Sequence, residues 1–369
     1  MTIKAITMPR WGMSMSEGKV AGWLVPVGRE ISAGDELVEI ETTKLTGVCE
    51  AHEGGGTLRR IVAENGTVRD VGALLGVISD ASDTDSEIDD FVATFTVAED
   101  EGVAGSGHSE ERIEIDGYQV NVLRADPVKS SALPLVLVHG FGGSADNWAL
   151  TVSAMSQGRP VIAIDLPGHG KSTKLVSDPR PELYAKIVAR ALKALDVGRC
   201  HLAGHSYGGL VSAILSSGNP DLIASLTLVD VAGLDSQIGE DYVGRFVRAM
   251  DRRSLRDVMG LLFEDTRRVS RSMIDDTLNY RWIEGVQGTL EKIAADLATR
   301  SGKFGRLPES ISERTLVIWG EKDKIFPPSH MERIPDSAEK HLIAGVGHMP
   351  HIESHDFNRL LTEFIARHE

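Results

Sequence analysis

The sequence predicts two domains of different class, an all-β sandwich and an α/β domain, joined by an acidic linker. Three observations predict this arrangement. The first 80 residues repeat themselves with a shift of 38 positions. Residues 80–111 contain eleven Asp or Glu and no Lys or Arg, and apolar strands alternate with helical stretches from about residue 112 onward. A chain of 369 residues is long enough for two or three domains.

The internal repeat aligns glycines with glycines and apolar residues with apolar residues. Glycine permits turns with positive φ, and the alternating apolar residues between the turns are typical of short strands. The repeat therefore predicts two similar four-strand halves, packed as a small sandwich or flattened barrel over residues 1–80. At a shift of 38 the matched pairs are Gly18/Gly56, Gly28/Gly66, Gly34/Gly72, Val20/Leu58, Trp23/Ile61, Leu37/Leu75 and Ile40/Ile78.

Lys44 lies in the connection between the two halves of the repeat. Strand-like residues 37–40 and 48–51 flank it, so residues 42–45 are expected to form a hairpin tip. A lysine at such a tip projects from a rigid base and suits the attachment of a long flexible group. A lone lysine is usually no more than a solvated surface residue. Its position at the centre of the repeat favours attachment.

The first domain resembles the lipoyl domains of 2-oxoacid and acetoin dehydrogenase complexes. The resemblance covers Met1 to about Asp80, with M-P-R-W-G-M-S-M-S-E-G near the start and V-E-I-E-T-T-K at the tip. The family usually has Asp-Lys-Ala at the tip, where this chain has Thr43-Lys44-Leu45. The related biotin carriers usually have methionine on both sides of the lysine, and this chain has it on neither. The resemblance implies lipoate attached covalently to Lys44.

The acidic segment, residues 81–111, is predicted to be a flexible tether because its like charges repel one another. Part of it has a helical pattern that follows Ser86, a possible N-cap. This short amphipathic helix is expected either to pack on its neighbouring domain or to bind a partner enzyme. Its apolar residues recur at i, i+3, i+4 and i+7: Ile88, Phe91, Val92 and Phe95.

Residues 112–369 predict a doubly wound α/β domain. A hairpin with an Asp116-Gly117 turn comes first. Helical stretches such as 183–195 alternate with the later strands, the order expected for a parallel sheet covered by helices. From about 233 to 305 no strand is predicted, and this charge-rich segment is expected to form a helical cap over an active site. The buried parallel strands are predicted at residues 135–138, 161–164, 200–203, 226–229 and 316–319.

A nucleophile elbow is predicted at Gly204-His205-Ser206-Tyr207-Gly208, because this string follows a strand and precedes an apolar helix. The glycines permit a sharp turn that lifts the serine side chain clear of the backbone. Asp323 and His348 follow later strands, and the chain order Ser, Asp, His is that of α/β-hydrolases. His348 would accept the proton of Ser206, and Asp323 would fix the imidazole tautomer.

Two further motifs extend the resemblance to α/β-hydrolases over about residues 112–369. The string 139–143, H-G-F-G-G, follows the first buried strand, and D-L-P-G-H-G, residues 165–170, follows the second. The backbone N–H groups of Phe141 and Tyr207 are expected to form an oxyanion hole beside the nucleophile.

Some roles in this predicted site have competing candidates. His351 lies three residues after His348, but G-x-G-H matches the family pattern and favours His348 as the base. Asp230 ends an earlier strand and is the fallback acid. His205 is expected to pack or to line the substrate site, and no constellation of metal ligands is predicted.

Charge and composition argue against several classes of function. A net charge of −15 without a Lys/Arg-rich run argues against nucleic acid binding. The two cysteines, Cys49 and Cys200, cannot build a disulfide framework or a CxxC metal site, as expected in a reducing cytosol. The N-terminus has no apolar signal core, and the apolar runs are too short to cross a bilayer. A cytoplasmic protein without membrane contact is expected.

The two domains together resemble the acyltransferase component of acetoin-cleaving dehydrogenase complexes, a family that fuses a lipoyl domain to an α/β-hydrolase-like domain. The resemblance implies transfer of an acetyl group from the lipoyl arm to coenzyme A. It also implies a homo-oligomer whose partners are a thiamine-diphosphate-dependent acetoin-cleaving component and a dihydrolipoyl dehydrogenase. The string H-x-x-x-D-G of 2-oxoacid acyltransferases does not occur, so transfer would use the serine site.

Two other functions fit the same residues. The first is a serine hydrolase of esters or carbon–carbon bonds that carries a lipoyl domain, since the predicted triad fits hydrolysis equally well. A hydrolase admits water to the acyl-enzyme, whereas a transferase excludes water in favour of a thiol. The second is a carrier and scaffold subunit with an inert hydrolase domain, against which the complete set of Ser206, Asp323 and His348 argues.

Overall fold

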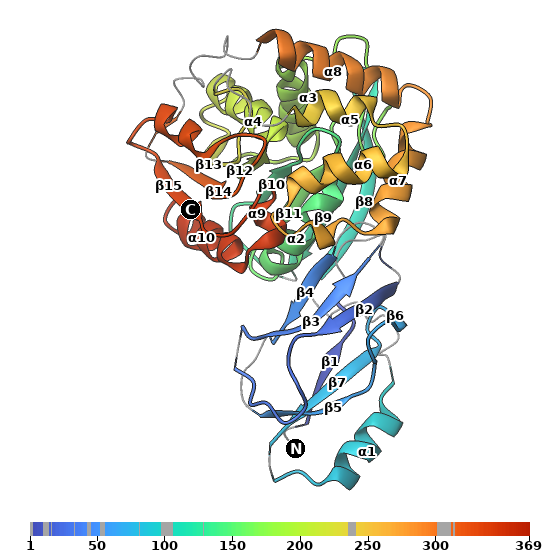
Figure 1. Cartoon of the computed structure of the whole chain (residues 1–369). Helices are drawn as coiled ribbons and strands as arrows, with labels where there is room; N and C mark the ends of the chain where they lie inside the picture. The colour runs from blue at the N-terminus through green and yellow to red at the C-terminus, as the bar shows by residue number, and fades with distance from the viewer. Residues whose placement is uncertain are drawn as a thin grey trace. The chain divides into compact units, whose positions relative to one another are not determined.

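The computed structural model describes residues 3–9, 15, 17–32, 34–42, 46–51, 56–80, 82–96, 106–127, 129–234, 241–300, 311–312 and 314–369. The chain divides into two compact units, Met1–Ala104 and Gly105–Glu369 (Figure 1). Each unit has its own sheets and its own hydrophobic core. Within the described ranges, no helix combines the length and the apolar character that crossing a membrane requires.

The first unit consists of two antiparallel sheets, as the internal repeat predicts. Among the described residues, one sheet has the order β1-β7-β5 and the other β4-β3-β2-β6. Equivalent strands of the repeat lie in opposite sheets, since β2 and β3 are in one and their counterparts β5 and β7 in the other. The strands are β1 (Lys4–Thr7), β2 (Glu17–Trp23), β3 (Glu36–Glu41), β4 (Thr46–Glu50), β5 (Thr57–Ile61), β6 (Val68–Asp70) and β7 (Leu74–Ser79).

The repeat extends to single backbone pairings. Lys19 pairs with Val68 between β2 and β6. The residues 38 positions away, Thr57 and Glu30, form an isolated antiparallel bridge. The counterpart of β6 in the first half is therefore a single bridge rather than a strand, and the described part of that half has fewer strands than the four predicted.

The repeated glycines have two different physical causes. Gly28 and its counterpart Gly66 have φ of 93° and 87°, in the left-handed region that favours glycine. Gly18 has no such conformation, but a Cβ there would lie 2.7 Å from Sδ of Met8. Glycines of the repeat therefore mark turns at two positions, 28/66 and 34/72, and close packing at Gly18.

Helix α1 (Asp85–Thr94) lies within the segment predicted to be a flexible tether. Ile88 is buried against Leu74 and Val77 of β7, and the other apolar residues of the predicted stripe join the same cluster. The amphipathic helix is therefore confirmed, and it packs on its neighbouring domain. The tether predicted at 81–111 is wrong at both ends, since α1 is part of the first unit and strand β8 of the second begins at Ser106.

The N-cap of α1 is Thr84 rather than Ser86. The backbone N–H of Glu87 donates to Oγ1 of Thr84 at 3.3 Å, and the Glu87 carboxylate accepts from the N–H of Thr84 at 2.8 Å. This capping box satisfies two backbone donors at once. If Ser86 were the N-cap, the Glu87 side chain would not take part in a capping box.

The second unit contains an eight-stranded sheet that is parallel except at one edge. Its order is β15-β14-β13-β12-β10-β11-β9-β8, and the hairpin of β8 and β9 forms the antiparallel edge. Asp116 and Gly117 have φ of 51° and 83°, the conformation of a two-residue hairpin turn, as predicted. The strands are β8 (Ser106–Ile115), β9 (Tyr118–Pro127), β10 (Leu135–Val138), β11 (Val161–Ile164), β12 (Cys200–His205), β13 (Ile223–Val229), β14 (Thr315–Gly320) and β15 (Glu339–Ile343).

Successive residues of the parallel strands enter opposite hydrophobic cores. In β10, Val136 and Val138 join the core that includes α3 and α4, whereas Leu135 and Leu137 join the core that includes α2 and α10. Burial of both faces explains why these strands are continuous apolar runs in the sequence. The helices on the two faces are α2 (Ala149–Met155), α3 (Pro181–Ala194), α4 (Tyr207–Gly218), α9 (Pro350–Glu353) and α10 (His355–Ala366).

The predicted cap lies between β13 and β14. The described part of residues 233–305 is helical and contains no strand. In Figure 1 helices α5 to α8 lie together beside the sheet. The elements are α5 (Tyr242–Arg248), α6 (Arg252–Met259), η3 (Gly260–Leu262), η4 (Thr266–Arg268), α7 (Arg271–Arg281) and α8 (Val286–Arg300), with η2 (Ala145–Trp148) and η5 (Pro328–Arg333) elsewhere.

Candidate active site

Ser206 occupies a sharp turn between β12 and α4. Its backbone has φ 52° and ψ −116°, which is rare for a residue other than glycine. The N–H of Ser206 donates to the carbonyl of Val229 at 2.8 Å, and its own carbonyl accepts from Ala232 at 3.1 Å. A Cβ on Gly204 would lie 2.4 Å from the carbonyl oxygen of Gly208, and a Cβ on Gly208 would lie 2.3 Å from the carbonyl oxygen of His139, so neither glycine of the motif tolerates a side chain easily. This is the geometry of a nucleophile elbow.

His348 and Asp323 are hydrogen-bonded in the loops that follow β15 and β14. Nδ1 of His348 lies 2.8 Å from Oδ2 of Asp323, and both side chains are buried. The other oxygen of Asp323 accepts from the backbone N–H of Ile325 at 2.8 Å and of Phe326 at 3.1 Å. The Asp323 carboxylate therefore has three hydrogen-bond donors. With the Nδ1 proton donated to Asp323, Nε2 of His348 keeps a lone pair that can accept a proton.

Asp230, the fallback acid, lies next to this pair at the end of β13. One of its oxygens accepts from the N–H of Gly320 at 3.0 Å. One atom each from Asp230, Asp323 and His348 lie within 4.8 Å of one another. Burial, followed by the negative charge of Asp323, raises the pKa of Asp230 well above its usual range. The raised pKa favours the neutral form of Asp230, and Asp323 is the carboxyl group that hydrogen-bonds to His348.

His205 holds the loop of His348 in place. Nε2–H of His205 donates to the backbone carbonyl of His348 at 2.8 Å, and the two rings lie 4.8 Å apart. Burial lowers the pKa of His205 well below its ordinary value, so the ring is neutral. Because His205 precedes Ser206 in the chain, this bond ties the elbow to the histidine loop. The structure agrees with the predicted packing role of His205.

His351 does not have the geometry of a base. Its ring lies between Trp148, at 4.3 Å, and His205, at 4.7 Å. Within the described part of the chain, neither ring nitrogen has a hydrogen-bond partner. Burial lowers the pKa of His351 to about 3. His351 is therefore a neutral packing residue.

The buried His351 makes the fold sensitive to acid. Its pKa rises from about 3 in the folded state to the ordinary 6.5 on unfolding, so the unfolded state binds the proton first as pH falls below 6.5. This side chain should therefore lower the free energy of unfolding by about 2 kcal/mol between pH 7 and pH 5. We expect His351→Phe, which keeps an aromatic ring, to lose less stability over this range in urea unfolding. Identical losses in both proteins would contradict this account.

The predicted oxyanion loop is fixed by His139. Leu166 N–H donates to Nε2 of His139 at 3.0 Å, which puts the ring proton on Nδ1, where it donates to the carbonyl of Gly140 at 2.8 Å. A Cβ on Gly140 would lie 3.2 Å from Cβ of Ser206, so the loop lies against the elbow. Phe141 follows directly in this loop, and Tyr207 is the first residue of α4. The loop that carries Phe141 and the first residue of α4 therefore both adjoin Ser206.

Asp165 is a structural residue that the motif did not explain. Its carboxylate accepts from the N–H of Ala145 at 2.7 Å, the N–H of Lys171 at 2.7 Å and the amide of Asn121 at 3.0 Å. A Cβ on Gly170 would lie 2.2 Å from either of its oxygens. The D-L-P-G-H-G string therefore supports the loop next to His139 rather than the chemistry itself.

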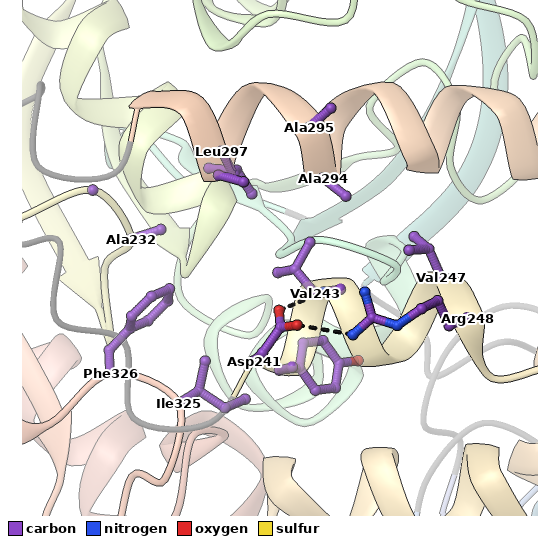
Figure 2. A pocket seen from close by; sticks show the side chains of 14 residues that line it. Ala232, Asp241, Val243, Val247, Arg248, Ala294, Ala295, Leu297, Ile325 and Phe326 are labelled. Atoms are coloured by element: carbon purple, nitrogen blue, oxygen red, sulfur yellow. Dashed lines mark hydrogen bonds and ion pairs between the residues drawn. The ribbon is translucent and has the colours of Figure 1, made fainter.

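A pocket of about 290 Å³ lies between the cap and the loops that follow β13 and β14 (Figure 2). Ala232, which bonds to Ser206, and Phe326, whose ring lies 5.5 Å from that of His348, are part of its lining. Helices α5 and α8 of the cap supply most of the other walls. The sequence predicted a cap but gave no sign of this pocket.

Comparison with known proteins agrees with both halves of the chain. The family model for the alpha/beta hydrolase fold matches residues 134–355, and the model for biotin-requiring enzymes matches residues 4–78. Two curated relatives are named dihydrolipoyllysine-residue acetyltransferase component of acetoin cleaving system. The protein from Cupriavidus necator is 37% identical over 99% of this chain and 98% of its own length. The protein from Pseudomonas putida is 37% identical over 99% of both chains.

The chain belongs to this acetyltransferase family. The predicted resemblance and the predicted fold class, a lipoyl-type β domain followed by an α/β-hydrolase domain, are confirmed.

Two proteins that are similar to the second domain alone are hydrolases. A 2-hydroxy-6-oxononadienedioate/2-hydroxy-6-oxononatrienedioate hydrolase from Burkholderia vietnamiensis is 29% identical over 63% of this chain and 87% of its own. The structure of a meta-cleavage product hydrolase from Pseudomonas fluorescens IP01 superposes with a TM-score of 0.61 and 22% identity, over 70% of this chain and 98% of its own. The second likeness shows that this member of the acetyltransferase family shares the hydrolase fold.

Lys44 lies outside the described residues. The strands on either side are described, and β3 pairs with β4 as far as Glu41 with Thr46. The described strands that precede and follow it therefore pair as an antiparallel hairpin, as the sequence predicted. Its role as the attachment residue stays a prediction.

Proposed function

We propose that this chain transfers an acetyl group from a lipoyl arm on Lys44 to coenzyme A, as the acetyltransferase of an acetoin-cleaving system. The observation that carries the proposal is 37% identity, across both domains, to two relatives of that name. The proposed partners are a thiamine-diphosphate-dependent acetoin-cleaving component and a dihydrolipoyl dehydrogenase. The proposed setting is a cytoplasmic multienzyme complex in which this chain forms a homo-oligomer.

The residues of the first domain fit a covalently attached lipoyl group. Attachment needs a primary amine on a well-supported connection. Lys19, another lysine of this domain, lies in a strand and pairs with Glu41 at 3.0 Å. Lys44 instead follows a paired hairpin strand. When bound, the lipoyl group supplies a dithiol that carries an acyl group as a thioester.

Ser206 and His348 would perform the first half of the transfer. Nε2 of His348 takes the hydroxyl proton while Oγ of Ser206 attacks the thioester carbonyl carbon. The N–H groups of Phe141 and Tyr207 would stabilise the negative charge on the carbonyl oxygen. The carbon–sulfur bond then breaks, and the departing sulfur takes the proton from His348. Ser206 is left as an acyl ester.

The second half runs through the same residues. The thiol of coenzyme A gives its proton to His348, and its sulfur attacks the acyl carbon on Ser206. The ester bond breaks, and Oγ of Ser206 recovers the proton from His348. Asp323 stabilises the imidazolium in both halves, while neutral Asp230 adds no second negative charge.

The runner-up function is hydrolysis of esters or carbon–carbon bonds. It is favoured by the 29% identity of the second domain to a hydrolase. The two functions differ in the group that attacks the acyl-serine, a thiol for transfer and water for hydrolysis.

The purified, lipoylated protein separates the two functions when it is incubated with S-acetyl-dihydrolipoamide, with and without coenzyme A. We expect acetyl-coenzyme A to account for nearly all of the acetyl group consumed, and release of acetate to be slow without coenzyme A. Acetate as the main product in the presence of coenzyme A would instead establish the hydrolase.

A further inference from the structure

We propose that the pocket between α5, α8 and the loops after β13 and β14 binds the hydrocarbon arm of the acyl donor, a dihydrolipoamide thioester, rather than the acceptor coenzyme A. This inference rests on the proposed function, since it distributes the two substrates of that reaction around Ser206. The pocket adjoins the proposed catalytic residues through Ala232 and Phe326, which contact Ser206 and the ring of His348. Two lining residues therefore place the pocket beside the residues that carry the proposed chemistry.

The chemistry of the lining favours an apolar ligand. Its polar side chains are Asp241, Arg248 and the phenol of Tyr242. Asp241 and Arg248 pair with each other at 3.0 Å, and their side chains are 62% and 67% exposed, so they lie at the rim (Figure 2). The remaining walls are apolar side chains, such as Val243, Leu297 and Phe326, or backbone.

The two substrates differ most in their polar groups. The pantetheine part of coenzyme A carries two amides and a hydroxyl, and its nucleotide end carries phosphates. Burying such groups without hydrogen-bond partners is costly. The lipoyl arm is an unbranched hydrocarbon between its dithiol and one amide, so an apolar pocket accommodates it at little cost.

The shape of the pocket depends on small residues of α8. Ala294, Ala295 and Ala298 line it from this helix, and Val247 lines it from α5 (Figure 2). An acetyl group alone would leave most of the space of about 290 Å³ empty. The pocket is close in size to the smaller ligand sites of proteins, about 300 Å³, which suits an extended arm.

Binding of free lipoamide to the unlipoylated protein tests this inference without catalysis. Each buried methylene contributes about fourfold in Kd, so a side chain that displaces two or more should weaken binding by about tenfold or more. We expect this loss, in isothermal titration calorimetry, for Ala294→Phe and for Val247→Phe on the opposite wall. Ala154→Phe, at an exposed alanine of α2 that does not line the pocket, is the matched control and should bind lipoamide normally. Unchanged Kd in both pocket variants, with native melting temperatures, would overturn the inference.

Steady-state kinetics separates donor from acceptor. The pocket variants should raise KM for S-acetyl-dihydrolipoamide by about tenfold, with little change in KM for coenzyme A or for a short acetyl thioester without the arm. A rise in KM for coenzyme A alone would assign the pocket to the acceptor and overturn the inference. If the unaltered protein makes no acetyl-coenzyme A, the proposed function fails, while the calorimetry still decides whether the pocket binds the arm.

Discussion

Ser206→Ala is expected to reduce the formation of acetyl-coenzyme A from S-acetyl-dihydrolipoamide by at least about 10³-fold, the scale of loss when a triad nucleophile is removed. The variant keeps the His348–Asp323 pair and the backbone bonds of the elbow, because none of these uses the serine hydroxyl. We therefore expect native thermal stability and normal lipoylation of Lys44. The rate is measured with saturating coenzyme A.

The same variant also tests whether the acyl group passes through the serine. When the unlipoylated protein is incubated with S-acetyl-dihydrolipoamide in the absence of coenzyme A, the intact mass should show one acetyl group on the unaltered chain. Ser206→Ala should show none. Ser216→Ala, a buried serine near the other end of α4, is the matched control and should react normally. Undiminished transfer by Ser206→Ala would mean that the thiol of coenzyme A attacks the donor directly.

The elements that the sequence predicted well are those with a strong apolar signal on both faces. The bounds of β10 and β11 match the predicted residues 135–138 and 161–164, because each strand is buried between two cores. β15 was not predicted. Its residues, E-K-H-L-I, are mostly polar because it lies at the edge of the sheet and pairs with β14 alone.

The start of β8 escaped prediction for the same reason. Residues 106–111 belong to the acid-rich segment, yet their backbone pairs with β9 from Ser106 with Pro127 onward. An edge strand is held by backbone hydrogen bonds on one side and needs no apolar side chains. Composition alone therefore could not separate this strand from a tether.

The candidate site was predictable in its residues but not in its distances. Chain order and context pointed to Ser206, Asp323 and His348, and the structure brings the last two within hydrogen-bonding distance. The neighbouring Asp230 ends a strand in the sequence, and the parallel sheet places it beside Asp323. The neutral form of Asp230 and the hydrogen bond from His205 to His348 depend on contacts between segments that are distant in the chain. No local sequence pattern could predict them.

Lys44→Arg is expected to abolish acetyl-coenzyme A formation from acetoin by the assembled complex, while leaving the turnover of free S-acetyl-dihydrolipoamide unchanged. Arginine keeps the positive charge of the hairpin connection but offers no amine for an amide bond to lipoate. Intact mass from a lipoate-competent host should show the lipoyl increment on the unaltered chain and none on the variant.

The coupled activity and the turnover of the free donor separate in this variant because the two domains have different roles. The arm supplies the donor at high effective concentration, on the order of millimolar for a short flexible connection, whereas Ser206 acts on any donor that reaches it. Lys19→Arg, at an exposed lysine of β2, is the matched control and should keep both the increment and the coupled activity. A lipoyl increment that persists in Lys44→Arg would place the arm on another lysine. An increment of biotin in the unaltered protein would replace the dehydrogenase-complex role with that of a carboxyl carrier.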